Sequence, residues 1–434
     1  MIKRSDEERA LIAQAERIFP TSTRCLTFEE GLNFCVGRAK GSHIWDVSGN
    51  EYIDYLLGSG PHLLGHAHPA VLEALRTVPE SGTSFLIVNR DAVRLGEKII
   101  EHVPCAEMVS LHSSGSEATF FALRLARVYR ERDKVLKFEG AYHGMHDYAL
   151  MSNQWTMGSP SFPKAVPNTH GIPHAIEDLV LVAPFNDLEA TAAIIGKHHD
   201  ELAAVIMEPV QRTFEPRPGF LEGVREITAN LGIPLIFDEV VTGFRMGLGG
   251  AQAHYGVTPD LCALGKAISG GLPLGVLCGR RDIMEIANPK RRLQMLPYSM
   301  QTGTFSSNPV CASVACAVIA ELEKPGVYER LEEVGKSVSA GLRDAIAHAG
   351  IEACVTGVPS VFEIWFTEGE PFDHRSAKRS DFYKNIRFSD LLLQRGVLKA
   401  AEKFFISAAH TDDDIERTVQ AFHLTLKQLA GEVA

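Results

Sequence analysis

Apolar runs of membrane-spanning length are missing from this 434-residue sequence, and residues 1–9 are charged rather than signal-like. We therefore expect a cytoplasmic protein that binds no membrane. Basic residues are outnumbered, because 43 Lys and Arg stand against 54 Asp and Glu and leave a net charge of −11. This balance disfavours nucleic-acid partners, although it is compatible with one locally positive pocket.

The eight cysteines follow no recognisable pattern. None belongs to a CxxC motif or pairs with histidine at zinc-ligand spacing, so we predict reduced core thiols rather than disulfides or a metal centre. His66 and His68 lie two residues apart before Pro69, without a supporting acid at ligand spacing. We predict no metal site there either.

The sequence does contain a large apolar fraction, 45%, in a chain long enough for more than one domain. Short apolar runs alternate with helical patterns at βαβ spacing from about residue 108 to residue 276. This alternation predicts an α/β fold with a mostly parallel, doubly wound sheet. After Lys324 the composition shifts to amphipathic helix and short strands, which indicates a smaller C-terminal domain.

Two of the apolar runs end in residues that can carry chemistry. The run 234–237 ends at Asp238, and the run 261–264 is followed by Gly265 and Lys266. Ligands of open α/β sheets bind beyond the carboxyl ends of the strands. There a desolvated lysine can act as an amine nucleophile, and an aspartate can keep a pyridine nitrogen protonated. The ordinary explanations are a helix cap for Asp238 and a solvated surface charge for Lys266.

Two further strand ends fit a flat, phosphorylated ligand. Ser114, Gly115 and Ser116 precede a long helix, and free N–H groups at a helix N-terminus suit a phosphate. A plain capping box with Glu117 is the alternative. Tyr142 follows another strand, where its ring can stack on a ligand or simply pack in the core.

In this order and spacing, the motifs resemble those of the class III aminotransferases, which are fold-type I pyridoxal 5′-phosphate (PLP) enzymes. The branch that contains glutamate-1-semialdehyde aminomutase is the most similar. The resemblance covers nearly the whole chain from Arg24 onward. Its motifs are Gly41–Asn50, Gly65–Pro69, Ser114–Ala118, Phe138–Gly144, Glu208–Val210, Phe237–Val240, Thr242–Arg245, Leu264–Lys266 and Gly303–Phe305.

The resemblance implies a large PLP-binding domain at residues 66–323. It also implies a smaller α+β domain made from residues 1–65 and 324–434. The implied cofactor-binding positions are Ser114, Gly115, Ser116, Tyr142, His143, Glu208, Asp238, Val240, Lys266 and Thr304.

Catalysis would then rest on Lys266 and Asp238. Lys266 would form an imine (Schiff base) with the cofactor and later move a proton between carbons. Asp238 would pair with the pyridine nitrogen. Val240 and Tyr142 would pack on opposite faces of the ring. Thr304 would reach the phosphate of a neighbouring subunit, which implies a homodimer with shared active sites.

Glu208 would support the region of the ring oxygen, and Gly115 and Ser116 would bind the phosphate through backbone N–H groups and a hydroxyl. Arg24 matches an arginine that holds a substrate carboxylate in this branch. It could equally be an ordinary surface residue.

Glu402 matches an acid that the aminomutase carries near its C-terminus, and Arg212 is a further candidate for substrate binding. The sequence departs from the aminomutase at Arg212 and Phe214, where a small glycine-containing stretch is expected, and at Lys403 beside Glu402. We therefore predict a ping-pong aminotransferase that moves an amino group between a carboxylate-bearing amine, with β- and aromatic amino acids as candidates, and a 2-oxo acid. The alternatives are an aminomutase, racemase or ammonia-lyase, and a non-catalytic binding protein, which the retained Lys266 and Asp238 disfavour.

Overall fold

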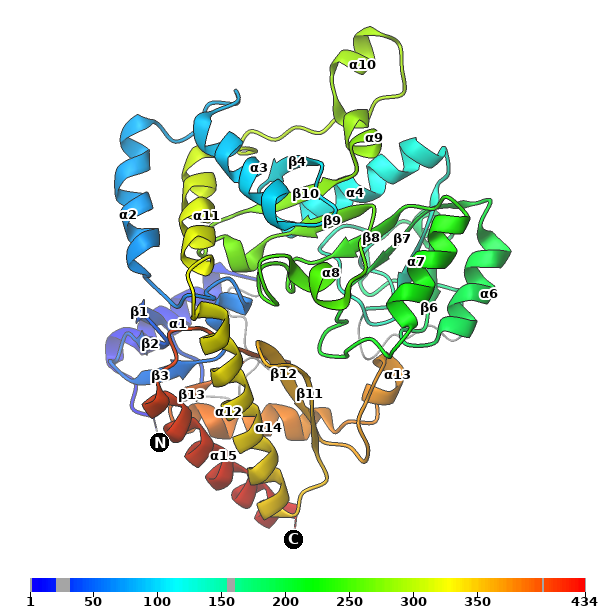
Figure 1. The fold of residues 1–434 in the computed structure, drawn as a ribbon. Coiled ribbons are helices and arrows are strands. Elements are labelled where there is room, and N and C mark those ends of the chain that lie inside the picture. Colours follow the sequence, from blue (N-terminus) through cyan, green and yellow to red (C-terminus); the bar gives the residue numbers. More distant parts are fainter. Residues whose placement is uncertain (1, 21–31, 154–160, 400–401, 434) are drawn as a thin grey trace. The chain divides into compact units, whose positions relative to one another are not determined.

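The computed structural model describes residues 2–20, 32–153, 161–399 and 402–433, and Figure 1 shows their fold. Contacts within the chain divide it into two compact units. Unit 1 comprises Met1–Pro69, Pro325–Pro371 and Ala377–Ala434, and unit 2 comprises Ala70–Lys324 and Phe372–Ser376. The short segment Phe372–Ser376 belongs to unit 2, although the chain on both sides of it belongs to unit 1.

Unit 2 is built on a seven-stranded sheet with the order β4-β10-β9-β8-β7-β5-β6. Its strands are β4 (Met108–His112), β5 (Lys134–Phe138), β6 (Val180–Ala183), β7 (Leu202–Met207), β8 (Leu235–Asp238), β9 (Leu261–Leu264) and β10 (Gly275–Gly279). All neighbours pair in parallel except β10, which is antiparallel to both β4 and β9. The prediction of an α/β fold with a mostly parallel sheet is confirmed.

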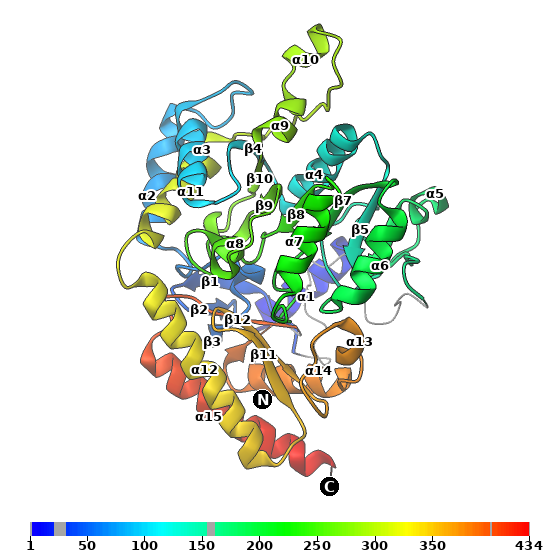
Figure 2. The ribbon, with the colours of Figure 1, turned by 45° about the vertical axis from the view of Figure 1, so that its right-hand side comes forward.

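The helices that follow the first strands of unit 1 in the chain are α2 (Pro69–Thr77), α3 (Arg90–His102), α4 (Gly115–Arg130), α5 (His174–Glu177), α6 (Leu188–His198), α7 (Phe220–Asn230), α8 (Gly250–Tyr255), α9 (Arg281–Met284), α10 (Lys290–Leu293) and α11 (Pro309–Leu322). Of these, α3, α4, α6, α7 and α9 contact strands of the sheet. Helix α4 buries its apolar face, including Leu123 and Leu125, in one core cluster with Ile206 and Ile236 of the sheet. Figure 2 shows α6 and α7 in front of the strands β5 to β8.

Four chain segments leave the sheet at the edge where β5, β7, β8 and β9 end. Because these strands are parallel, their carboxyl ends lie on one side of the sheet. The residues that follow them are Glu139, Glu208, Glu239 and Gly265. The sheet therefore brings sequence positions more than 120 residues apart to one edge.

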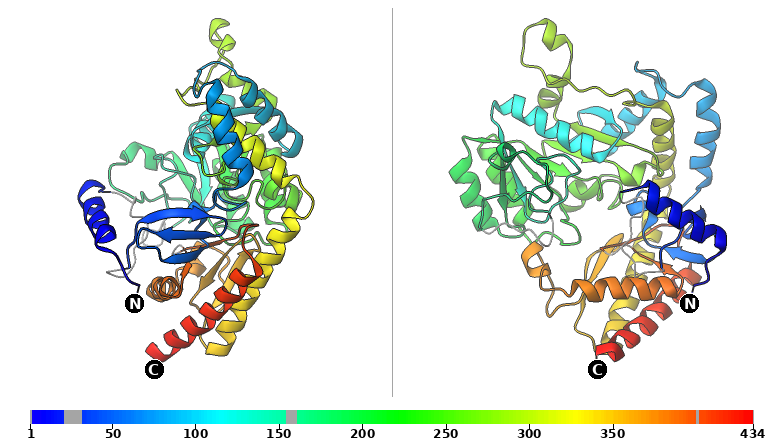
Figure 3. Two further views of the ribbon diagram at one scale, coloured as in Figure 1. Left: turned by 90° about the vertical axis from the view of Figure 1, so that its left-hand side faces the viewer. Right: turned by 180° about the vertical axis from the view of Figure 1, so that it is seen from behind.

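Unit 1 contains two small sheets and long helices. The sheet β1-β2-β3-β13 consists of Val36–Lys40, His43–Asp46, Glu51–Asp54 and Val397–Leu398, and the sheet β11-β12-β14 consists of Cys354–Val358, Val361–Trp365 and Phe404–Phe405. The helices are α1 (Asp6–Ile18), α12 (Val327–Ala349), α14 (Phe382–Gln394) and α15 (Asp412–Val433), and α13 (His374–Ala377) crosses the boundary of the units. Helices α12 and α15 lie side by side, as Figures 1 and 3 show.

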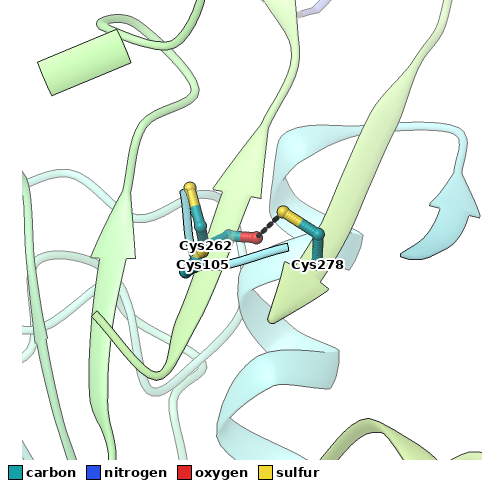
Figure 4. A group of neighbouring side chains, drawn as sticks. All are labelled: Cys105, Cys262 and Cys278. Carbon is teal, nitrogen blue, oxygen red and sulfur yellow. Dashed lines mark hydrogen bonds between the residues drawn. The ribbon is translucent and has the colours of Figure 1, made fainter. Parts of the chain in front are cut away.

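Three thiols meet inside unit 2, as Figure 4 shows: Cys105, Cys262 and Cys278. Their sulfur atoms lie within 4.8 Å of one another, and the Cys278 thiol contacts the backbone oxygen of Cys262 at 3.6 Å. Burial raises the pKa of the Cys262 thiol, which makes it a poor nucleophile. The seven cysteines among the described residues are all free thiols.

No helix in the described part of the chain is both long and apolar enough to cross a membrane.

Candidate active site

Asp238 and His143 form the centre of the site. Asp238 is the last residue of β8 and is buried. One of its carboxylate oxygens lies 2.8 Å from His143 Nδ1, and the other accepts a hydrogen bond from the backbone N–H of Val240 at 3.1 Å. The carboxylate is thus held from both sides, which fixes its direction at the end of the strand.

Lys266 lies two residues beyond the end of β9. Its backbone φ is 35°, in the left-handed region that side-chain-bearing residues seldom adopt. Such strain persists only where the surrounding structure holds it, and it is frequent at functional sites. Burial lowers the pKa of the Lys266 ammonium, while the charges of Asp238 and Glu208 oppose this effect. The environment therefore increases the share of neutral, nucleophilic amine.

Tyr142 and Glu208 belong to two loops that meet beside this lysine. The Tyr142 backbone N–H donates to Glu208 Oε2 at 3.0 Å, and Glu208 is buried. The Tyr142 side chain remains 37% exposed, and partial burial raises the pKa of its phenol. The ring is therefore neutral and open on part of its surface, as a stacking platform must be.

The start of α4 combines a cap with a close approach. Ser114 Oγ accepts from the Glu117 N–H at 3.2 Å, and the Glu117 carboxylate accepts from the Ser113 N–H at 2.7 Å. A side chain at Gly115 would place its Cβ 2.8 Å from Val240 Cγ2. Only glycine fits there because the N-terminus of α4, where backbone N–H groups lack partners within the helix, lies against the Asp238–Val240 turn.

Ser116 lies against the loop that follows Tyr142. Its hydroxyl accepts from the Met145 N–H at 3.1 Å, and a Cβ on Gly144 would come within 2.5 Å of that oxygen. Thr119, one turn further along α4, donates its hydroxyl to the His143 backbone oxygen at 2.6 Å. The first turns of α4 and the loop that carries Tyr142 and His143 therefore form one packed assembly.

These residues fit a PLP molecule. The buried His143 Nε2 has no hydrogen-bond partner among the described residues, so a polar group can be accommodated beside it. Asp238 offers a carboxylate for a ring nitrogen, the α4 N-terminus offers donors for a phosphate, and Lys266 offers an amine for a carbonyl.

The predicted substrate residues fall into three groups. Arg212 belongs to unit 2, where its charge lowers the pKa of both Lys266 and Tyr142, so its guanidinium acts on the same site. Glu402 is exposed in unit 1, where its negative charge raises the pKa of both Glu363 and Lys399. Arg24 lies outside the described residues.

Arg212 occupies a constrained turn. The backbone groups of Gln211 and Phe214 exchange two hydrogen bonds across it, at 3.0 and 2.8 Å, and Arg212 has a φ of 61°. Thr304, the predicted contact to a neighbouring subunit, lies on an exposed loop of unit 2.

Lys137 was not among the predicted site residues. It is a fully buried residue of the strand β5, and its ammonium group contacts the loop that carries Tyr142. The sequence does carry a sign that Lys137 is unusual, since it lies between the apolar residues Leu136 and Phe138 of a strand. Charged residues are almost never buried unless they are paired.

Comparison with known proteins assigns the family. The model of the Aminotransferase class-III family matches residues 28–422. The glutamate-1-semialdehyde 2,1-aminomutase of Desulforudis audaxviator is 44% identical over 390 residues, which cover 88% of this chain and 88% of that protein.

Two solved structures share the whole fold. An omega-transaminase from Sphaerobacter thermophilus superposes with a TM-score of 0.91 at 33% identity, covering 99% of each chain. A transaminase with PLP bound superposes with a TM-score of 0.89 at 29% identity, again covering 99% of each chain. The chain therefore belongs to the class III aminotransferases, PLP-dependent enzymes of fold type I, and within them to the branch of glutamate-1-semialdehyde aminomutase.

Proposed function

We propose that this enzyme is an aminomutase that moves an amino group between adjacent carbons of a small amino-aldehyde carboxylate. The observation that carries amino-group chemistry is the desolvated Lys266 beside the Asp238–His143 pair. The aminomutase reaction itself is supported by the name of the relative at 44% identity. This proposal replaces transamination of a β- or aromatic amino acid, the main prediction from the sequence.

The reaction on glutamate 1-semialdehyde would be an isomerisation. The amino group leaves C2 for C1 and the oxo group moves from C1 to C2, which converts 4-amino-5-oxopentanoate into 5-amino-4-oxopentanoate. No atom is gained or lost, so no second oxo acid is consumed. PLP supplies the electron sink that makes the carbon-bound hydrogen acidic and carries the amino group.

The protein's own residues hold this chemistry in place. The Lys266 amine, whose pKa burial lowers, would take a proton from one carbon and return it to the next. Asp238 would keep the ring nitrogen of PLP protonated, and His143 holds the Asp238 carboxylate in position. The N-terminus of α4 with Ser114, Gly115 and Ser116 would hold the phosphate.

Arg212 is the residue of unit 2 that we assign to the substrate carboxylate. A guanidinium binds a carboxylate through two parallel hydrogen bonds. The charge of Arg212 lowers the pKa of both Lys266 and Tyr142, so Arg212 lies close enough to the site to bind a substrate carboxylate there. Arg24 and Glu402 remain proposed substrate contacts from the resemblance alone.

The active unit that we propose is a homodimer. Two loops of unit 2 expose apolar side chains: Leu86, Ile87 and Val88 on one, and Met295 and Phe305 on the other, each 65–91% exposed. The two loops line one cavity of about 660 Å³. Large exposed apolar patches mark interaction surfaces, and Thr304 lies within the second loop.

Ile87→Asp should therefore yield a monomer in sedimentation equilibrium, with Leu424→Asp on α15 as an exposed control. A wild-type monomer would contradict the dimer.

A second function, transamination, is favoured by one observation. Arg212 and Phe214 stand where the resemblance to the aminomutase predicts small residues, and the charge of Arg212 lowers the pKa of Lys266. A bulkier and more basic segment close to Lys266 would favour a different substrate.

The deciding experiment supplies glutamate 1-semialdehyde as the sole substrate to PLP-loaded enzyme. The aminomutase proposal predicts catalytic formation of 5-amino-4-oxopentanoate by NMR without an oxo acid, and none with Lys266→Ala. Turnover that requires an added 2-oxo acid would establish transamination instead. Free ammonia as the product would establish a lyase.

A further inference from the structure

Lys137 has three acceptors for the three hydrogens of its ammonium group. Its Nζ donates to the backbone oxygens of Ala141 at 2.9 Å, Ala149 at 3.0 Å and Met151 at 2.6 Å. The side chain is 1% exposed and projects from β5, which Figure 2 labels. Only the charged form has three N–H donors, so the site matches an ammonium rather than a neutral amine.

The peptide group between Ala141 and Tyr142 is bound at both ends by buried charges. Its C=O accepts from Lys137 Nζ, and its N–H donates to the Glu208 carboxylate at 3.0 Å. A cation at the oxygen and an anion at the nitrogen both favour one direction of the peptide dipole. This peptide group adjoins the Cα atom of Tyr142, so its orientation determines the direction in which the Tyr142 side chain leaves the backbone.

The residues before this peptide are held as well. The backbone oxygen of Glu139 accepts from Gln211 Nε2 at 2.7 Å, and the Glu139 carboxylate accepts from Arg375 Nε at 2.7 Å. A Cβ on Gly140 would lie 2.6 Å from His374 Nδ1, so the chain passes this point without spare room. The loop has little freedom to absorb the loss of Lys137.

We propose that Lys137 is a positioning residue that fixes the segment 139–143, and thereby Tyr142 and His143, relative to Asp238. The proposal rests on the proposed PLP chemistry only for its catalytic consequence. The geometry of the loop is a property of the protein alone.

The charge of Lys137 is costly, which argues that it serves more than packing. Burial lowers the pKa of its ammonium to about 7, Glu208 opposes this effect and Arg212 adds to it. A methionine would fill the same volume without that cost. The chain nevertheless keeps a lysine, at the position that reaches the carbonyl next to Tyr142.

The test compares Lys137→Met with Lys134→Met, a control on the same strand whose lysine pairs with Glu201 near the surface. Hydrogen exchange is measured by mass spectrometry on full-length protein, both PLP-loaded and freed of PLP. Lys137→Met should speed exchange of the amides in segment 140–152 by at least about tenfold, since charge-assisted hydrogen bonds are lost. Peptides that cover β8, and the Lys134→Met protein, should exchange as the wild type does.

A second readout concerns catalysis. Borohydride should still fix PLP to Lys266 in Lys137→Met, while kcat falls by about tenfold or more and KM changes little, because a displaced Tyr142 and His143 affect the reacting state. A purely structural lysine would lower stability without this split between kcat and KM. Wild-type exchange in segment 140–152, or wild-type kcat, would overturn the proposal.

If Lys137→Met does not fold, wild-type protein provides the test. Raising the pH from 6 to 9 deprotonates the Lys137 ammonium, so the protection factors of segment 140–152, corrected for intrinsic exchange, should fall by more than those of β8, beside which Glu239 titrates. A fall in segment 140–152 no larger than that in β8 would overturn the proposal. Because this measurement needs no substrate and no PLP, it stays valid even if the aminomutase proposal fails.

Discussion

His143 Nδ1 lies 2.8 Å from an Asp238 carboxylate oxygen, although the two residues are 95 positions apart in the sequence. One residue ends the strand β8 and the other belongs to the loop after β5, so the order of strands in the sheet creates the pair. The pair fixes the direction of a buried carboxylate, which we propose pairs with the ring nitrogen of PLP.

Replacing Asp238 by Asn should leave the shape of the site and remove its charge. A neutral amide cannot hold a proton on a ring nitrogen, so kcat should fall at least about a hundredfold, the size of effect seen when a preorganised electrostatic partner is lost. Single-turnover kinetics with PLP-loaded enzyme measure this loss. Asp282→Asn, at a half-exposed carboxylate of unit 2, should retain wild-type kcat.

Gly115→Ala should weaken PLP binding, because the new methyl group would collide with Val240 at the helix N-terminus. We expect the dissociation constant of PLP to rise about tenfold or more, as a displaced helix end loses charge-assisted hydrogen bonds to the phosphate. Equilibrium dialysis measures it. Gly196→Ala in α6 meets no atom within 4 Å and should leave the constant unchanged.

Glu239 predicts a pH dependence of stability. Burial raises the pKa of its carboxyl group to about 7, against hydrogen bonds from Thr242, Ala251 and Gln252. Between its unfolded value near 4.5 and 7, the folded protein holds a proton that the unfolded chain has released, so this group's contribution to stability falls as pH rises through that window.

Urea unfolding of wild type and Glu239→Gln at pH 5 and pH 8 measures this contribution. Wild type should lose free energy of unfolding relative to the variant between the two pH values. An unchanged difference would show that the carboxyl group titrates at its ordinary pKa.

Arg212→Ala should raise KM for carboxylated substrates by about ten- to a hundredfold, the worth of a hydrogen-bonded charge pair. Methyl esters of the same substrates should be affected far less, because they carry no charge for the guanidinium to bind. Arg217→Ala, five residues further along and exposed, serves as the control. Equal effects on acid and ester would remove Arg212 from the substrate site.

The sequence revealed the site where chemistry and strand ends coincide. Asp238 and Lys266 could be predicted because each follows a short apolar run. The capping box at Ser114 is confirmed, and the phosphate site at the same helix N-terminus stays a prediction. The βαβ spacing did not predict that β10 is antiparallel to its neighbours. The connection from Leu264 to Gly275 is shorter than a crossover between parallel strands requires, and this length indicates the antiparallel direction.

Long-range contacts could not be predicted in the same way. The contacts of Lys137 could not be predicted from the sequence. Its three hydrogen-bond acceptors are backbone oxygens of a loop, and no local sequence pattern determines the path of that loop. The segment Phe372–Ser376 belongs to unit 2, and one of its contacts there is the ion pair between Arg375 and Glu139, which joins positions 236 residues apart. Such contacts emerge only when the whole chain has packed.

Covalent trapping tests the central claim, that the Lys266 amine binds the cofactor and moves the proton. Borohydride treatment of PLP-loaded enzyme, followed by peptide mass spectrometry, should place the reduced cofactor on Lys266 in wild type and on no lysine in Lys266→Ala, which should also lose turnover. Reduced cofactor on a different lysine, or undiminished turnover by Lys266→Ala, would contradict the account.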